Sequence, residues 1–174
     1  MIAGDSLGQA VTDTQAVLAG EKRPIFEATL QAGGLLIRAD LMLPDQDGYR
    51  MVEVKSSTSV KDYHLTDAAI QSWVAQQSDL TLTSVEIAHI DNTFVYPGDG
   101  DYQGLFHYAD VSEQISEMKN EVPDWIKDAQ ETLSGEEPCI AAGDQCNSPF
   151  PCSFIEYCSP QTDPEDGFPP EVLP

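Results

Sequence analysis

The chain has 174 residues, 41% of them hydrophobic, which is enough for one domain with a proper core. Its 30 acidic and 8 basic residues give a formal net charge of −22, and such a surface repels phosphate backbones and argues against generic nucleic-acid binding. No apolar run approaches the length of a membrane span, and residues 1–10 lack a signal-peptide pattern, so we expect a cytoplasmic protein with no membrane partner.

The first half of the chain predicts one helix and a three-stranded meander. Apolar residues at helical spacing predict a helix over 6–19. The run 24–30 alternates as a strand does, with odd- and even-numbered residues on opposite faces and Glu27 among the odd ones. A pair of glycines then makes a tight turn into a second strand over 35–43.

A turn rich in Pro, Asp and Gly at 44–48 joins this strand to a third one over 51–55. If the hairpin folds about the middle of the turn, residue numbers on opposing strands sum to about 93 and Asp40 lies opposite Glu53. Lys55 then shares a face with Glu53. Opposed carboxylates repel each other, so the arrangement favours a divalent cation between them.

The second half continues with helix and strand. Helical spacing predicts a helix over 64–77, with Gln71 on a different side from its buried stripe. That stripe is Leu65, Ala68, Ala69, Trp73 and Val74. A strand over 84–90 follows, and the order strand, helix, strand predicts a crossover with parallel pairing. After an apolar piece at 94–96 and a loop rich in Gly and Asp, residues 105–108 read as a further strand.

A long helix is predicted from Val111 to Leu133, where apolar residues recur every three or four positions. Asp110 and Glu113 resemble a capping box at its start. Pro123 falls inside it and predicts a kink or two segments. The whole order predicts an α/β fold, in which a central mixed sheet has helices on both faces and precedes a small cysteine-rich lobe.

Three regions follow from this order: a core at 1–135, a cysteine lobe at 136–160 and an acidic, Pro-rich, disordered tail at 161–174. The lobe holds all four cysteines, Cys139, Cys146, Cys152 and Cys158. Four cysteines so close together imply one four-ligand site. Zinc sites usually contain a tight Cys-x2–4-Cys pair, which this spacing lacks. Wider loops favour a 4Fe–4S cluster, with zinc as the runner-up and disulfides or free thiols as further alternatives.

The predicted hairpin has the chemistry of a phosphodiesterase site. The carboxylates of Asp40 and Glu53 and the carbonyl of Val54 suit Mg²⁺ or Mn²⁺. A bound metal would polarise the scissile phosphate and lower the pKa of a bound water. Lys55 would position that water or neutralise charge on the phosphorus. The alternative is a surface hairpin with an ordinary ion pair, because the spacing Asp-x12-Glu-x-Lys often occurs by chance. The extreme acidity also has two explanations, a salt-loving source or a solubilising surface, and the scarcity of lysine favours the first.

The phrases at 25–29, 38–41, 52–57 and 149–158 resemble the PD-(D/E)XK nuclease superfamily, in its RecB-like branch. The similarity is greatest to the CRISPR-associated RecB-like exonucleases and their standalone relatives, which carry an iron–sulfur cluster. It covers most of the chain and implies a restriction-endonuclease-like fold.

The resemblance implies a role for each residue of the site. Asp40 and Glu53 would bind the metal, Lys55 would be catalytic, and Gln71 would help to hold the lysine or the DNA backbone. Glu27 lies where many members carry a supporting acid, and its alternative role is that of a solvated strand residue. The resemblance also supports the 4Fe–4S cluster, in which Cys139 either replaces a ligand that relatives supply near the N-terminus or is a bystander.

These inferences lead us to expect a Mg²⁺- or Mn²⁺-dependent DNA nuclease, acting as an exonuclease on single-stranded or free ends, alone, as a homo-oligomer or in a protein complex. Relatives usually supply a histidine ahead of the first helix, whereas no histidine precedes Asp40 here, so we expect a shortened or compact member with reduced activity. His64, His89 and His107 are expected to be structural or exposed. The rival hypothesis is a non-catalytic binding or assembly module that keeps the hairpin for stability.

Overall fold

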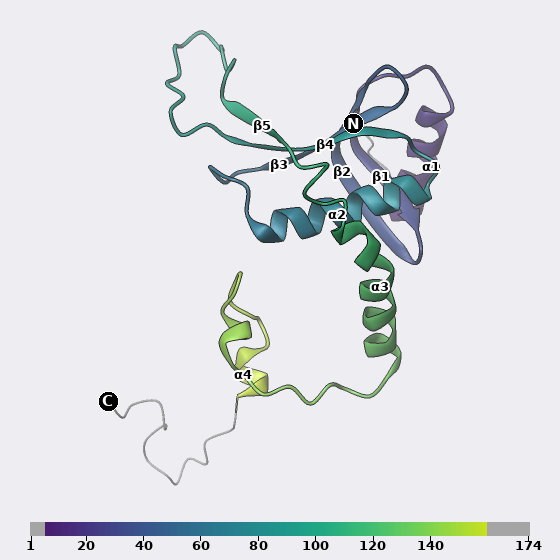
Figure 1. Ribbon diagram of the computed structural model, residues 1–174, viewed down its shortest axis with the longest axis vertical. Helices are drawn as coiled ribbons and strands as arrows, with labels where there is room; N and C mark the ends of the chain where they lie inside the picture. The colour runs from purple at the N-terminus through teal and green to yellow at the C-terminus, as the bar shows by residue number, and fades with distance from the viewer. Residues whose placement is uncertain (1–5, 160–174) are drawn as a thin grey trace. The chain divides into compact units, whose positions relative to one another are not determined.

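The computed structural model describes residues 6–159 (Figure 1). They form an α/β fold in which a five-stranded mixed sheet is flanked by helices, so the predicted fold class is confirmed at this level. Contacts divide the chain into two units, Met1–Glu131 and Thr132–Pro174, and the first contains the whole sheet. The tail predicted at 161–174 lies outside the described residues. None of the described helices is both long and apolar enough to cross a membrane.

The helices and strands follow the predicted order. The helices are α1 (Leu7–Leu18), α2 (Asp62–Gln77), α3 (Met118–Ser134), the one-turn α4 (Ile155–Cys158) and a 3₁₀ turn, η1 (Asp144–Cys146). The strands are β1 (Ile25–Ala32), β2 (Leu35–Pro44), β3 (Tyr49–Lys55), β4 (Leu82–Ile90) and β5 (Phe106–Asp110). The apolar piece at 94–96 lies in the loop between β4 and β5 and forms no strand.

The strands lie in the order β1-β2-β3-β4-β5, with antiparallel neighbours except for the parallel pair β3 and β4. Helix α2 makes the crossover between these two and contacts β1, β2 and β4 (Figure 1). In the β2–β3 hairpin, Leu41 pairs with Val52 and Met42 with Met51. Each pair of residue numbers sums to 93, so the predicted register and the predicted parallel crossover are both confirmed.

Glu27 interrupts the alternation of β1. Its backbone φ is +60°, in the left-handed region that residues other than glycine rarely adopt. The core side chains on either side of Glu27 are Ile25 and Ala28, which are three residues apart. They pair with Met42 and Ala39 on β2. A regular strand would put Ile25 and Ala28 on opposite faces. That prediction is wrong, because the turn of the backbone at Glu27 brings both side chains into one core.

The last long helix starts later than predicted. Residues 112–117 form turns, and α3 begins only at Met118. Pro123 lies inside α3, in its second turn, and has no N–H to donate to the carbonyl of Lys119 four residues before it. The predicted capping box is also wrong, because Asp110 Oδ1 accepts from the Ser112 N–H at 2.9 Å and so caps the preceding turn.

Candidate functional site

Asp40 lies where the backbone ladder between β2 and β3 ends. The last backbone pair is Leu41 with Val52. Beyond it, the Val54 N–H donates to Asp40 Oδ2 at 2.8 Å, so a side chain takes the place of a backbone partner. This bond fixes the Asp40 carboxylate beside Glu53, as the hairpin register predicted.

Glu53 is almost enclosed, with 8% of its surface exposed. Burial raises the pKa of its carboxyl; the hydrogen bond from Lys55 opposes this rise, and repulsion from Asp40 adds to it. Glu53 Oε1 accepts from Lys55 Nζ at 2.8 Å. Its other oxygen, Oε2, is buried and has no hydrogen-bond partner. One oxygen of the carboxylate is therefore available to a ligand.

Lys55 lies between two carboxylates. Its Nζ donates to Glu53 Oε1 at 2.8 Å and to Asp67 Oδ2, on α2, at 2.6 Å. Burial by itself would lower the pKa of Lys55, but the two hydrogen bonds and the two negative charges raise it overall. Lys55 is therefore an ammonium ion at neutral pH.

Gln71 is buried, with 6% of its surface exposed, so the buried surface of α2 extends from the predicted stripe to the side that carries Gln71. Positions 64, 68, 71 and 75 are all buried and are four, three and four residues apart, which puts them on one helix face. The Gln71 Nε2 donates to Asp67 Oδ1 at 3.1 Å. Its Oε1 is buried and has no hydrogen-bond partner.

Glu27 lies close to Asp40 in the sheet but is directed elsewhere. Because Phe26 pairs with Leu41 and Ala28 with Ala39, Glu27 falls opposite Asp40 in the register. Its Oε2 lies 3.7 Å from Arg38 Nε, in a half-exposed ion pair. The expected supporting acid therefore neighbours the site through the sheet, and its carboxylate is paired with an arginine.

The donor atoms of the site suit a hard cation, although they are not a ready-made cage. Among residues 6–159, no three His, Cys, Asp or Glu side chains form a group that could hold a metal ion. Within the same residues, Glu53 Oε2 and Gln71 Oε1 are the two buried side-chain polar atoms without a partner. Both are acceptors, so a cation or a proton satisfies them. Carboxylate and amide oxygens are the ligands that Mg²⁺ and Mn²⁺ prefer.

Two histidines lie near Lys55, and a third lies next to one of them. His64, at the start of α2, is buried, and its Nδ1 accepts from the Lys61 N–H at 3.1 Å. Burial lowers the pKa of His64, and the charge of Lys55 adds to this effect. His89 pairs with Lys55 in the β3–β4 register, and the rings of His89 and His107 are 5.1 Å apart. The site thus has imidazole neighbours that the sequence did not indicate.

The four cysteines belong to the second unit and are all free. Cys146 is buried, Cys152 is half-buried, and Cys139 and Cys158 are exposed. The Cys152 N–H donates to the Cys146 carbonyl at 2.7 Å, and Cys152 Sγ accepts from the Phe154 N–H at 3.4 Å. The thiols are therefore the right donors for a cluster or zinc but are not drawn together around one point in the described residues.

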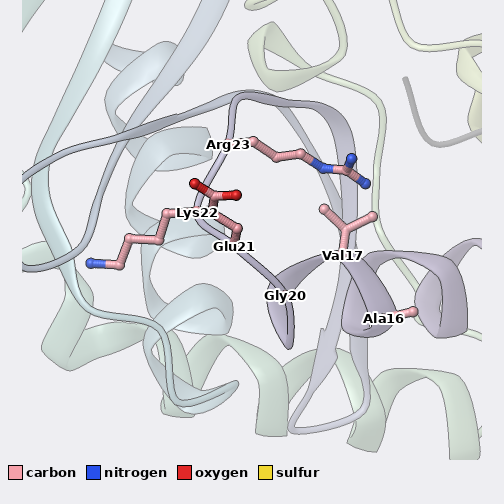
Figure 2. Close-up of a pocket in the computed structure, with 6 residues that line it drawn as sticks. All are labelled: Ala16, Val17, Gly20, Glu21, Lys22 and Arg23. Atoms are coloured by element: carbon pink, nitrogen blue, oxygen red, sulfur yellow. The ribbon is translucent and has the colours of Figure 1, made fainter.

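A cavity of about 450 Å³ opens beside the turn between α1 and β1 (Figure 2). Its lining residues are Ala16, Val17, Gly20, Glu21, Lys22 and Arg23, none of which belongs to the predicted site. Figure 2 shows the side chains of Lys22 and Arg23 pointing in opposite directions, so these two cations do not converge on one ligand.

No protein-family model, curated protein or solved structure matches this chain. The likeness to RecB-like nucleases therefore depends on the residues quoted above and stays a prediction.

Proposed function

We propose that this chain is a divalent-metal-dependent nuclease with a restriction-endonuclease-like fold, which hydrolyses phosphodiester bonds in DNA. One observation carries the proposal. Glu53 Oε2 and Gln71 Oε1, both buried and both without a partner, lie in one site with Asp40 and Lys55. Buried acceptors without a donor are rare in folded proteins, and a bound cation would satisfy both of them, as a proton would in the metal-free protein.

Each residue has a role that follows from its geometry. Asp40 and Glu53 would hold the metal, with the Val54 carbonyl as a further oxygen donor, and Glu27 would join them only by leaving its ion pair with Arg38. When bound, Mg²⁺ or Mn²⁺ supplies a Lewis acid for the scissile phosphate and a water of lowered pKa. The Val54 N–H orients the Asp40 carboxylate, because it occupies one of its oxygens. Gln71, on α2, would contribute its buried amide oxygen as a further metal ligand.

Lys55 supplies a positive charge and does not act as a base. Its pKa is raised, so the ammonium keeps its proton at neutral pH. An ammonium can donate to a non-bridging phosphate oxygen and stabilise the negative charge that develops on the phosphorus. This is one of the two roles predicted for Lys55 from the sequence, the other being to position the attacking water.

Single-stranded or free-ended DNA is the substrate that suits this surface best. The chain carries a net charge of −22, which repels the dense charge of a duplex. A single strand has a lower charge density, and high salt screens the remaining repulsion. Assays at low salt would therefore underestimate the activity.

For the cysteine unit we propose a 4Fe–4S cluster held by Cys139, Cys146, Cys152 and Cys158, with zinc as the alternative. Four thiols in one short segment and the N–H donor to Cys152 Sγ support this proposal. The cluster would be structural. Protein purified without oxygen should be brown and contain iron, whereas a colourless protein with bound zinc would overturn the assignment.

The activity test compares three proteins on end-labelled single-stranded DNA with Mn²⁺ in molar salt. Wild type should cleave, and Asp40→Ala should lose the metal-dependent cleavage. Asp47→Ala removes an exposed carboxylate from the turn of the same hairpin and serves as the control, which should cleave as wild type does. Unchanged cleavage by Asp40→Ala would sink the site assignment.

A further inference from the structure

Asp67 connects the part of the site on strand β3 with the part on helix α2. It lies on α2, four residues before Gln71, and 41% of its side chain is exposed. Its Oδ2 accepts from Lys55 Nζ at 2.6 Å, and its Oδ1 accepts from Gln71 Nε2 at 3.1 Å. Each oxygen of this one carboxylate is therefore bonded to a different residue of the site.

We propose that Asp67 is a positioning residue, which retains the Lys55 ammonium in the site when Glu53 binds a divalent cation. This inference rests on the proposed function of the same site.

The argument begins with competition for Glu53. Lys55 and a divalent cation both seek the Glu53 carboxylate, whose side chain is only 10% exposed. An ammonium ion held by Glu53 alone would occupy one of the metal's ligands. Asp67 offers a second anion at a shorter distance, 2.6 Å against 2.8 Å, and on the solvent side of the site. With Asp67 present, Lys55 can leave Glu53 and still remain next to the reacting phosphate.

Asp67 also decides which end of the Gln71 amide faces the cation. An ionised carboxylate is an acceptor only, so Gln71 must present its amino group to Asp67. The amide oxygen is then the end left free, and it is one of the two buried acceptors without a partner. Loss of the Asp67 charge would release both the ammonium and the amide from their present orientations.

The test uses Asp67→Asn, which keeps the size of the side chain and removes its charge. Asp62→Asn removes an equal charge from the first turn of the same helix and is the matched control. Electron paramagnetic resonance titration measures Mn²⁺ affinity, and single-stranded DNA cleavage measures kcat and KM. We expect Asp67→Asn to weaken Mn²⁺ binding several-fold and to lower kcat by about tenfold with little change in KM, whereas the control changes neither. Asp67→Glu should restore part of both losses.

The same titration in a Lys55→Met background separates positioning from direct metal binding. If Asp67 acts chiefly through Lys55, Asp67→Asn should weaken Mn²⁺ binding clearly less when the lysine is gone, because only its effect on the Gln71 amide then remains. An equal loss of affinity in both backgrounds would overturn the proposal, because Asp67 would then act on the metal itself.

A readout without metal or DNA distinguishes this proposal from the proposed function. In protein labelled with ¹⁵N-lysine, the Lys55 Nζ signal should move in Asp67→Asn and stay in place in Asp62→Asn. A protein that binds no Mn²⁺ and cleaves no DNA would contradict the proposed function, and with it the role of Asp67 in that site. An unmoved Lys55 signal in an active nuclease would contradict the positioning role alone.

Discussion

The carboxylate of Asp40 accepts a hydrogen bond from the backbone N–H of Val54 at 2.8 Å. The bond joins two strands just past the end of their backbone ladder and holds a negative charge next to the buried Glu53. Asp40 thus has a structural role, which depends on its oxygen as an acceptor, and a proposed metal-binding role, which depends on its charge.

The two roles of Asp40 separate on substitution. Asp40→Asn keeps an acceptor for the Val54 N–H, so the free energy of unfolding should change by less than about 1 kcal/mol. Loss of the charge should lower Mn²⁺-dependent cleavage on the order of 100-fold, as expected when several kcal/mol of metal-assisted stabilisation is lost. Urea unfolding and cleavage rates measure the two effects. Full cleavage by Asp40→Asn would rule out its charge as a metal ligand.

Lys55→Met should have opposite effects on binding and on turnover. Without the ammonium, Glu53 Oε1 loses its competing partner and Mn²⁺ affinity should rise. Cleavage should fall, because the charge next to the phosphate is gone. Lys127→Met, on an exposed helix position, is the control for a general loss of positive charge. Calorimetric titration with Mn²⁺ measures the change, and weaker binding by Lys55→Met would contradict the competition.

Glu53 should make the metal-free protein less stable as the pH rises. Burial raises the pKa of this carboxyl in the folded state above its unfolded value of about 4.3. Its contribution favours folding below that value and is lost as the pH rises through the raised folded-state pKa. Glu53→Gln removes this dependence, so the variant should gain stability relative to wild type as the pH increases. Denaturant midpoints in EDTA between about pH 4 and 8 measure the difference. A constant difference over this range would show that Glu53 does not titrate as a buried group.

The ion pair between Arg50 on β3 and Glu86 on β4 should stabilise the sheet with the opposite pH dependence. Arg50 Nε and Nη2 donate to the two oxygens of Glu86 at 2.9 and 2.6 Å. The hydrogen bonds from Arg50 lower the pKa of Glu86, although burial opposes them. The stability that this pair contributes is present above the unfolded pKa of about 4.3 and is lost as the pH falls through the lower folded-state pKa.

Arg50→Met should therefore destabilise the fold by about 2 kcal/mol at neutral pH, since the almost enclosed Glu86 loses a charged donor. The difference from wild type should shrink in acid, as the pH falls through the lowered folded-state pKa of Glu86. Arg23→Met, at an exposed arginine for which residues 6–159 offer no ion pair, is the control and should change stability little. A loss that stays the same in acid would indicate packing by the Arg50 stem and not the ion pair.

Local chemistry made the hairpin and the sheet predictable. The Pro/Asp/Gly turn fixed the register of β2 on β3, and that register alone placed Asp40 beside Glu53. Along this part of the chain the apolar residues change from the spacing of a strand to that of a helix and back, and this change located α2 between two parallel strands. These features depend on residues close together in the sequence, which is why a single chain was enough to infer them.

The parts that could not be predicted depend on tertiary contacts. Nothing in the sequence of a strand signals the left-handed φ of Glu27, which changes the faces of β1. The burial of Gln71 was missed because the apolar stripe of α2 suggested the wrong centre for its buried face. Asp67 had one usable signal, since a residue four positions before Gln71 shares its helix face. Its bond to Lys55 joins residues on a strand and a helix, and only the packed structure shows it.

Paramagnetic broadening by Mn²⁺ tests the central claim most directly, because this very acidic chain could also bind the ion loosely all over its surface. In ¹⁵N-labelled protein at molar salt, sub-stoichiometric Mn²⁺ should first broaden the backbone amide signals of Asp40, Glu53, Val54 and Gln71. Signals of the turn at 44–48, which is also acidic, should broaden only later. Broadening that starts at the turn, or that spreads evenly over the acidic surface, would contradict a divalent-metal site between Asp40 and Glu53.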